Sequence, residues 1–280
     1  MSVFDQAFRR PEHQPFFWRQ EGADHAALLV HGFPGTPADM LPVADVLHSA
    51  GWDVQGILLP GFGPQISTLH ERRAEDWLLA ICEALANLKR EYANVLLVGY
   101  SMGGALSMQA AAIEPPSSLV LLAPFWKIDN ILWAMLPAIR RVVPEVPIFS
   151  MYKLDFNDPH IRAELLNFVP DIDADDPETQ RAVREYRLPL SILNEVRAAG
   201  LAGYRAASRI YARTLIIQGT RDEIVLPSLT RKLAKRFPRY MEYVEVPADH
   251  LLTNPQAAAW PDIRQSIVDF AELSIGQNVR

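Results

Sequence analysis

Short, continuous apolar runs alternate with amphipathic segments along most of the chain. Four runs have the length and residue types of strands that are buried on both faces, namely 26–30, 95–98, 119–122 and 214–217. Helical patterns lie between them: Thr36 and Pro37 predict a helix start, Gly51 predicts its end, and a second helix covers 75–92. Strands and helices in alternation predict a doubly wound, mostly parallel α/β sheet, whose ligands bind beyond the carboxyl ends of the strands.

The alternation stops after the strand 119–122 and resumes at the strand 214–217. Over about 85 residues in between, the pattern contains no convincing buried strand. We interpret the segment 126–208 as an inserted helical cap, or lid, on a core formed by 1–125 and 209–280.

The first part of the predicted cap is apolar on most sides. Apolar side chains are most stable when they cover apolar surface, so these residues either contact an apolar part of the substrate or pack the cap on the core. The residues we would assign to substrate binding are Trp126, Trp133, Met135 and Phe149. Further along, a charged loop leads to Asp176 and Pro177, which predict a helix start. Its acids have no His or Cys beside them and lack the spacing of a calcium loop, so we expect no metal site there.

The segment Gly99-Tyr100-Ser101-Met102-Gly103 fits the pattern Gly-x-Ser-x-Gly directly after the strand 95–98 and before a helical segment 104–113. In a sharp strand-to-helix turn the neighbouring backbone comes so close that only glycine fits two positions either side of the serine. Ser101 is thereby predicted to stand exposed above the sheet edge. The start of the helix offers unpaired N–H groups to a developing oxyanion.

A serine hydroxyl is a poor nucleophile unless a base takes its proton. Asp222 follows the strand 214–217 through a four-residue turn, and His250 follows the strand 241–246 through three residues. Both therefore reach the sheet edge where Ser101 lies, and the chain order serine, aspartate, histidine is one in which such triads occur.

Other residues compete for these roles. Glu223 and Asp249 are carboxylates directly beside Asp222 and His250 in the chain, and Asp129 follows the strand 119–122 closely. His31 begins the glycine-rich turn 31–35 and is a candidate ligand or base, although a role in orienting that turn is favoured. The turn would supply the second half of an oxyanion hole, with the backbone N–H groups of Phe33 and Met102 as donors.

Four motifs together resemble the α/β-hydrolase superfamily, most of all its bacterial carboxylesterase and monoacylglycerol lipase branch: His31-Gly32-Phe33, Gly99-Tyr100-Ser101-Met102-Gly103-Gly104, Gly219-Thr220-Arg221-Asp222 and Ala248-Asp249-His250. The resemblance covers most of the core and does not extend to the cap in detail. It implies that Ser101 is the nucleophile, Asp222 the orienting acid and His250 the general base, with Phe33 and Met102 as oxyanion donors. Phe62 stands where the family commonly has a histidine, and Asp249 stands where it usually has a glycine.

We expect hydrolysis of short to medium acyl carboxylic esters through an acyl-enzyme, without a cofactor. Monoacylglycerol lipase, feruloyl or aryl esterase, thioesterase and carbon–carbon bond hydrolase are the alternatives, since one triad serves them all. A non-catalytic receptor that only binds a small molecule is the alternative from another class of protein.

The charge and composition of the chain restrict the classes of partner that it can bind. The chain of 280 residues has a formal net charge of −6 and no long cluster of Lys and Arg, which disfavours nucleic acid. Cys82 is the single cysteine, so an intramolecular disulfide is excluded. The first residues lack the apolar block of a secretory signal, and no apolar run approaches the roughly 20 residues of a membrane span. We expect a cytoplasmic protein whose partner is a small ester with an apolar acyl or alcohol group; a homodimer stays open.

Overall fold

The computed structural model describes residues 7–147, 155–158, 162, 165, 169–239 and 241–276. Its centre is a seven-stranded sheet of order β1-β3-β2-β4-β5-β8-β9. In this sheet β1 pairs antiparallel with β3, and all the remaining neighbouring strands pair in parallel. The strands are β1 (Phe16–Trp18), β2 (His25–Val30), β3 (Asp53–Ile57), β4 (Asn94–Tyr100), β5 (Ser118–Leu122), β8 (Arg213–Gly219) and β9 (Met241–Val246). The predicted doubly wound, mostly parallel sheet is confirmed.

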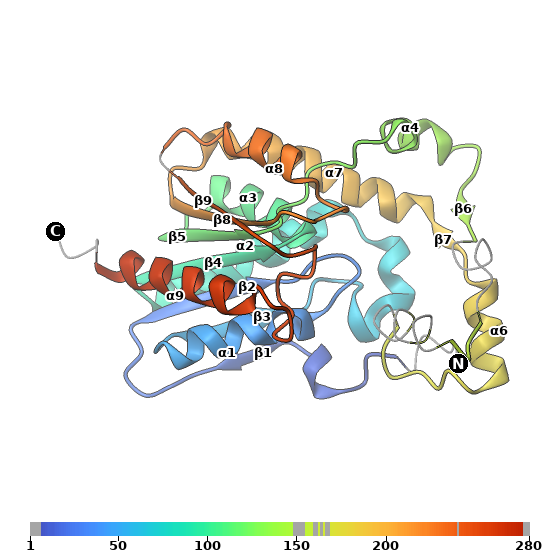
Figure 1. Ribbon diagram of the computed structural model, residues 1–280, viewed down its shortest axis with the longest axis horizontal. Coiled ribbons are helices and arrows are strands. Elements are labelled where there is room, and N and C mark those ends of the chain that lie inside the picture. The colour runs from blue at the N-terminus through green and yellow to red at the C-terminus, as the bar shows by residue number, and fades with distance from the viewer. Residues whose placement is uncertain are drawn as a thin grey trace.

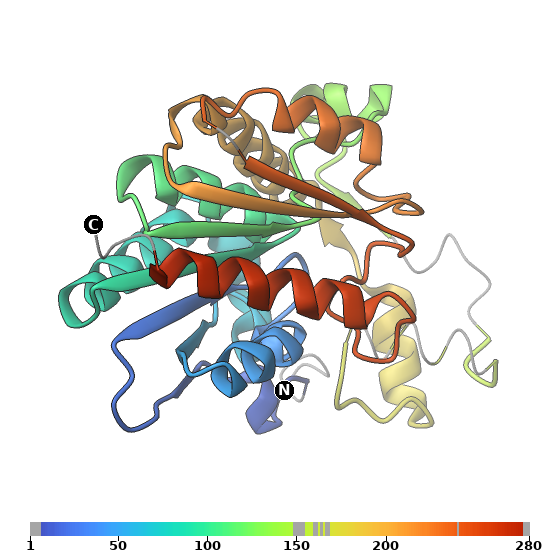
Figure 2. The same ribbon diagram turned by 60° about the vertical axis from the view of Figure 1, so that its left-hand side comes forward.

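Helices cover both faces of this sheet (Figures 1 and 2). One face carries α1 (Leu41–Ser49) and α9 (Trp260–Gly276). The other carries α2 (Ala74–Glu91), α3 (Met102–Ile113), α7 (Leu190–Ala206) and α8 (Pro227–Ala234). Short 3-10 helices, among them η2 (Pro11–His13), η3 (Pro37–Met40), η4 (Gly63–Glu71) and η5 (Ala207–Arg209), lie in the connections.

The strands are continuous apolar runs because each one contributes to two cores. In β2, Leu28 and Val30 belong to the cluster beneath α2 and α3, whereas Ala27 and Leu29 belong to the cluster beneath α1 and α9. All four side chains are fully buried. Successive residues of a strand point to opposite faces, so a strand covered by helices on both sides shows no polar alternation.

The start of the first long helix differs slightly from the prediction. Thr36 does act as an N-cap, with its hydroxyl accepting a hydrogen bond from the Ala38 N–H, but the turn it caps is the 3-10 helix η3. α1 follows directly, and Gly51 adopts the left-handed φ of +93° just after its end. A left-handed residue at this position is a common helix ending, and glycine adopts it without steric cost.

The segment predicted as a cap contains α4 (Ile131–Ile139), the paired strands β6 (Glu145–Val146) and β7 (Leu188–Pro189), and α6 (Pro177–Glu185). These elements lie beyond the carboxyl ends of the central strands, at the right of Figure 1. α7 differs, since it packs along α3 on the sheet. A Cβ atom on Gly203 would lie 2.5 Å from the backbone oxygen of Ala105, so only glycine permits this approach. The division into a core and a cap over 126–208 stays a prediction.

The order of the strands fixes where a ligand site can form. From β2 the chain passes to β3 on one side of it, and then crosses to β4 on the other side. The turns after β2 and β4 therefore diverge above the sheet, and the crevice they leave is where open α/β sheets bind ligands. Ser101 and the turn 31–35 follow these two strands.

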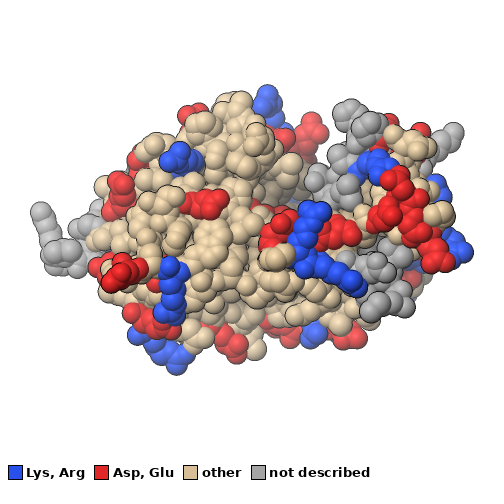
Figure 3. Space-filling model, turned by 90° about the horizontal axis from the view of Figure 1, so that it is seen from below, with Lys and Arg blue, Asp and Glu red and all other residues tan. Residues whose placement is uncertain are grey.

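Charged side chains are spread over the surface. On the face shown in Figure 3, Lys and Arg stand among Asp and Glu and do not gather over one element. Within the part of the chain that the structure describes, no helix has the length and apolar character required to cross a membrane.

Candidate active site

Ser101 occupies a strained turn between β4 and α3. Its φ of +52° lies in the left-handed region, which costs a non-glycine residue about 1–3 kcal/mol. The backbone is held in place because the Ser101 N–H donates to the Leu122 oxygen (2.9 Å) and its own oxygen accepts from the Phe125 N–H (3.0 Å). A Cβ atom on Gly103 would lie 2.4 Å from the backbone oxygens of Val30 and His31, at the end of β2, so the motif requires glycine at this position.

The fold brings the three sequence-predicted residues into one hydrogen-bonded row. His250 Nε2 lies 3.0 Å from Ser101 Oγ, and His250 Nδ1 lies 2.8 Å from Asp222 Oδ2. The Asp222 side chain is fully buried, and 12% of the His250 side chain is exposed. In this arrangement the carboxylate accepts the Nδ1 proton, which leaves Nε2 free to take the hydroxyl proton of Ser101.

Asp222 is fixed by donors on both carboxylate oxygens. Its Oδ1 accepts from the N–H groups of Ile224 (2.9 Å) and Val225 (2.7 Å), and its Oδ2 accepts from Gln218 Nε2 (3.1 Å). Gln218 is fully buried and was not among the sequence-predicted site residues. The feature of the sequence that could have indicated this role is a polar residue within the apolar strand β8, directly before the turn to Asp222.

The competing carboxylates have other partners. Asp249 Oδ1 accepts from the Leu251 N–H (2.9 Å), and Asp129 pairs with the Lys127 ammonium (2.6 Å). Glu223 is exposed. Of the carboxylates considered, Asp222 is the one in hydrogen-bonding contact with His250.

Tyr100 anchors the loop that carries the imidazole. Its hydroxyl donates to the backbone oxygen of His250 (3.0 Å), and the two rings lie 5.4 Å apart. Burial, with the charges of Asp39 and Asp222 nearby, raises the pKa of Tyr100 far above its usual range. The phenol therefore stays protonated and remains a donor. In the sequence, Tyr100 stands out only as one of the two variable positions of the serine motif.

The turn after β2 lies against the serine. A Cβ atom on Gly32 would be 3.1 Å from Ser101 Cβ, so the two backbones are in contact distance. Phe33 follows Gly32 in this turn, and Met102 is the first residue of α3. Of the two residues predicted to supply oxyanion donors, Met102 thus follows Ser101 directly and Phe33 follows the glycine that lies against it. The first N–H groups of a helix have no partner within it, which suits Met102 to that role.

His31 holds this turn, and its recorded hydrogen bonds go to Gly32 and Leu59, not to Ser101, Asp222 or His250. Its Nε2 accepts from the Leu59 N–H (3.1 Å), so the proton is on Nδ1, which donates to the Gly32 oxygen (2.8 Å). Complete burial lowers the pKa of His31 to about 4, and the ring is neutral at physiological pH. Phe62 packs edge-on against both His31 and Phe33 and so supports the same turn.

The four residues assigned to substrate binding lie in different surroundings. Trp126 is enclosed between α7 and α8, where its indole N–H donates to the Leu229 oxygen (3.0 Å) and its ring stacks on Tyr204. Trp133 meets the Phe125 ring edge-on, and Met135 is 51% exposed. Phe149 lies outside the described residues. The contacts of Trp126 are those of a packing residue, and the assignment of the four to substrate binding stays a prediction.

The acidic segment before α6 forms a capped loop. Asp176 accepts from the N–H groups of Glu178 and Thr179, as the sequence predicts for the start of a helix. Asp175 pairs with Arg162. Among the residues that the structure describes, no cluster of three or more His, Cys, Asp or Glu side chains is arranged to hold a metal ion.

The chain is similar to known proteins in sequence and in fold. The chain is 33% identical over 102 residues to a thermostable monoacylglycerol lipase of Bacillus sp. (strain H-257), which is 36% of this chain and 40% of that protein. It is 30% identical over 108 residues to a carboxylesterase of Bacillus subtilis (strain 168), 38% of this chain and 43% of that one. The matches thus span about two fifths of the length of these curated relatives.

The fold is shared over a greater length. A solved structure from work on LipS and LipT, two metagenome-derived lipolytic enzymes, superposes with a TM-score of 0.71 at 21% identity and covers 94% of this chain and 98% of that one. The model of the alpha/beta hydrolase family matches residues 27–260, which include the serine turn, the turn after β2 and both predicted partners of Ser101. The chain therefore belongs to the alpha/beta hydrolase family.

Proposed function

We propose that this protein is a serine esterase that hydrolyses short to medium acyl carboxylic esters through an acyl-enzyme intermediate. The observation that carries the proposal is the hydrogen-bonded row from Asp222 through His250 to Ser101. A strained serine, a histidine within 3.0 Å of its hydroxyl and a buried carboxylate behind the histidine form the arrangement that acyl transfer requires.

The first half-reaction forms the acyl-enzyme. Ser101 Oγ attacks the ester carbonyl carbon while His250 Nε2 takes the hydroxyl proton. The carbonyl oxygen gains a negative charge, which the backbone N–H groups of Phe33 and Met102 would stabilise. The tetrahedral intermediate then collapses, the carbon–oxygen bond to the alcohol breaks, and the leaving alcohol takes its proton from His250.

The second half-reaction releases the acid. A water molecule gives a proton to His250 and attacks the acyl carbon, and the same two N–H groups stabilise the second oxyanion. Collapse returns the proton to Ser101 Oγ and frees the carboxylic acid. Asp222 keeps the imidazole in the required tautomer through both halves, because its Oδ2 holds the proton on Nδ1.

Similarity to a monoacylglycerol lipase and to a carboxylesterase supports an ester as the substrate. The apolar residues of the cap proposed over 126–208 favour a substrate with an apolar acyl or alcohol group. A monoacylglycerol is the second candidate, and turnover of monoacylglycerols beside short acyl esters of simple alcohols separates the two.

The test is a panel of p-nitrophenyl esters of increasing acyl length, measured with the native protein and with Ser101→Ala. We expect a maximum at short to medium chains. Loss of the nucleophile of a triad lowers kcat by about 10⁶-fold, so Ser101→Ala should have no measurable turnover. Ser208→Ala is the matched control, since Ser208 is an exposed serine far along the chain whose hydroxyl bonds the Arg205 oxygen.

A fluorophosphonate probe tests the nucleophile directly. It should label the native protein and Ser208→Ala, and it should not label Ser101→Ala. Hydrolysis that persists in Ser101→Ala would refute the proposal. Failure of the native protein to label or to turn over any ester, with a small molecule still bound, would identify a receptor in its place.

A further inference from the structure

A second row of carboxylate, imidazole and hydroxyl lies outside the triad, with His13 at its centre. His13 Nδ1 lies 2.8 Å from Thr36 Oγ1. On the other side of the ring, His13 Nε2 lies 3.8 Å from Asp171 Oδ2 and 4.0 Å from Glu12 Oε1. The side chains of His13 and Asp171 are each 8% exposed, and Thr36 is buried. A hydroxyl as buried as that of Thr36 is out of reach of a substrate, so the row acts on the protein around it.

The row joins three segments that are far apart in the sequence. His13 ends η2, Thr36 follows the turn after β2, and Asp171 belongs to the segment predicted as a cap. Arg10 holds Asp171 in place, since its guanidinium pairs with Oδ1 (2.5 Å) and its backbone N–H donates to Oδ2 (3.2 Å). The N-terminal segment, the turn after β2 and the predicted cap therefore meet at His13.

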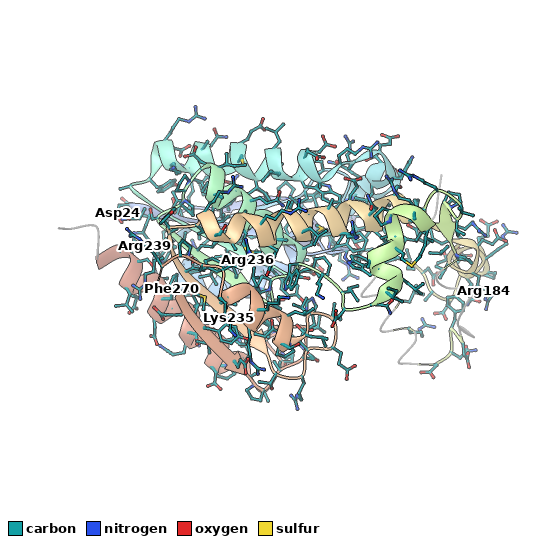
Figure 4. The ribbon with its side chains drawn as sticks, turned by 90° about the horizontal axis from the view of Figure 1, so that it is seen from above. Asp24, Arg184, Lys235, Arg236, Arg239 and Phe270 are labelled. Carbon is teal, nitrogen blue, oxygen red and sulfur yellow. The ribbon has the colours of Figure 1, made fainter. Side chains whose placement is uncertain are left out.

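Apolar packing fixes the same junction. A small core, separate from the two that flank the sheet, contains Phe8 and Phe156. The Phe8 ring meets the His13 ring edge-on at 5.3 Å, and the Arg184 guanidinium lies 4.8 Å from the centre of the Phe156 ring. Arg184, on α6, lies at the end of the molecule opposite Asp24, which precedes β2 (Figure 4). The small core thus lies beyond the carboxyl ends of the strands, at the sheet edge that carries the triad.

The charges around the His13 ring decide which nitrogen carries the proton. Burial lowers the pKa of His13, although the carboxylates of Asp171 and Glu12 oppose this effect, so the ring is neutral at pH 7.5. The proton of the neutral ring stays on Nε2, because an unprotonated nitrogen facing two carboxylates would be repelled by them. Nδ1 then accepts a hydrogen bond from the Thr36 hydroxyl, whose oxygen accepts in turn from the Ala38 N–H (3.3 Å).

Thr36 stands at the end of the turn that is proposed to carry an oxyanion donor. At the start of this turn, His31 donates to the Gly32 oxygen. That oxygen lies 3.4 Å from where a Cβ atom of Gly35 would be, so the turn closes on itself. Phe33 lies between the two anchored ends. An oxyanion donor acts only at hydrogen-bonding distance from the developing charge, so the position of the Phe33 N–H depends on both ends of the turn.

We propose that His13 is a positioning residue of the esterase reaction. By accepting a hydrogen bond from the Thr36 hydroxyl, it holds the turn that presents the Phe33 N–H to the oxyanion, and Asp171 keeps the ring in the tautomer that this bond requires. The inference rests on the proposed esterase function and deepens it, because it makes the oxyanion hole depend on a residue of the predicted cap. Loss of the bond displaces a donor without removing it, so the effect on turnover should be smaller than the roughly 10²–10³-fold of a lost donor.

Steady-state hydrolysis of p-nitrophenyl butyrate by the whole protein, with kcat and KM determined separately, tests the proposal. His13→Phe keeps a ring and removes the acceptor, and Thr36→Val removes the hydroxyl. We expect each to lower kcat by about tenfold with KM within about twofold. His13→Asn places an amide oxygen where Nδ1 stands and should recover most of kcat. Asp171→Asn, which the left-handed backbone at φ +66° tolerates, should lower kcat by about threefold.

Two readouts separate positioning from a loss of stability. A trifluoromethyl ketone forms a serine adduct that carries an oxyanion, and its inhibition constant should rise by the factor by which kcat falls. The double variant of His13→Phe and Thr36→Val should lower kcat no further than Thr36→Val alone. His48→Phe is the matched control, since His48 is half-buried on α1, packs on the Trp18 ring and has a hydrogen bond to the Trp52 oxygen (3.2 Å). This control should lower Tm and leave kcat unchanged.

The outcomes distinguish this inference from the proposed function. If turnover depends on Ser101 but His13→Phe and Thr36→Val keep the native kcat, the inference is wrong and the proposed function stands. An equal fall of kcat in His48→Phe, or no recovery in His13→Asn, would also overturn the inference alone. A native protein without Ser101-dependent turnover would overturn both.

Discussion

Replacing Gln218 with methionine should remove a hydrogen bond that holds the Asp222 carboxylate in place. The Gln218 amide nitrogen donates to Asp222 Oδ2 (3.1 Å), to the Val225 oxygen (3.0 Å) and to the Gly219 oxygen (3.2 Å). Its amide oxygen accepts from the Thr230 hydroxyl (2.6 Å). Methionine has nearly the same length and offers none of these bonds, so Gln218→Met removes the polar interactions with little change in packing.

The structure gives the expected magnitude. The Gly219 oxygen keeps a hydrogen bond from the Asp222 N–H, so two buried groups, the Val225 oxygen and the Thr230 hydroxyl, lose the partner recorded for them. Each such group costs about 1–3 kcal/mol, and we expect the free energy of unfolding to fall by about 3 kcal/mol. For a chain of this length that lowers Tm by about 5 °C.

The effect on catalysis should be smaller than loss of the carboxylate itself. Asp222 retains two backbone donors on Oδ1, but Oδ2, which bonds the imidazole, loses its second donor. We expect kcat for p-nitrophenyl butyrate to fall about tenfold with KM nearly unchanged, a small part of the roughly 10⁴-fold lost when a triad aspartate no longer orients its histidine. We therefore expect Gln218 to act as a positioning residue.

Thr230→Val is the matched control. It breaks the bond to the Gln218 oxygen and leaves the donor to Asp222 in place, so stability should fall by about 1 kcal/mol and kcat should stay within about twofold. Urea unfolding and steady-state kinetics measure both quantities. If Gln218→Met lowers kcat no more than Thr230→Val does, the glutamine does not position the triad.

Three further predictions follow from the site. Tyr100→Phe removes the hydrogen bond to the His250 oxygen, so the free energy of unfolding should fall by about 1 kcal/mol and kcat should fall a few-fold. Urea titration and the ester assay measure the two effects. Unchanged values would mean that this hydrogen bond is not needed to hold the His250 loop. Gly103→Ala places a Cβ 2.4 Å from two backbone oxygens, so it should cost about 2 kcal/mol or more and abolish most turnover; a fully active, stable variant would contradict the packing. His31 has a folded-state pKa of about 4, below its unfolded value, so the unfolded chain takes up a proton first and stability falls as pH drops below about 6.5. Between pH 7.5 and pH 5, the free energy of unfolding of the native protein should fall by about 2 kcal/mol more than that of His31→Gln. The contributions of the other titrating groups cancel in this difference. If the two free energies fall in parallel with pH, the His31 ring is not buried and neutral.

The sequence by itself determined the features that depend on neighbours along the chain. Buried strands such as β2 and β5 were predicted because a run covered on both faces has no polar position, and the serine turn because its glycines are required by a close approach that any such turn makes. The predicted row of Ser101, Asp222 and His250 also followed from local reasoning, since each residue comes directly after a strand and parallel strands end at one edge.

Only the tertiary structure decided which side chains meet across distant segments. Gln218 and Tyr100 form hydrogen bonds to Asp222 and His250 that no spacing rule specifies, and the position of Trp126 between α7 and α8 was not predictable either. Periodicity and local turns report which face of an element is buried, but the identity of the neighbour on that face is set by strand order and helix packing.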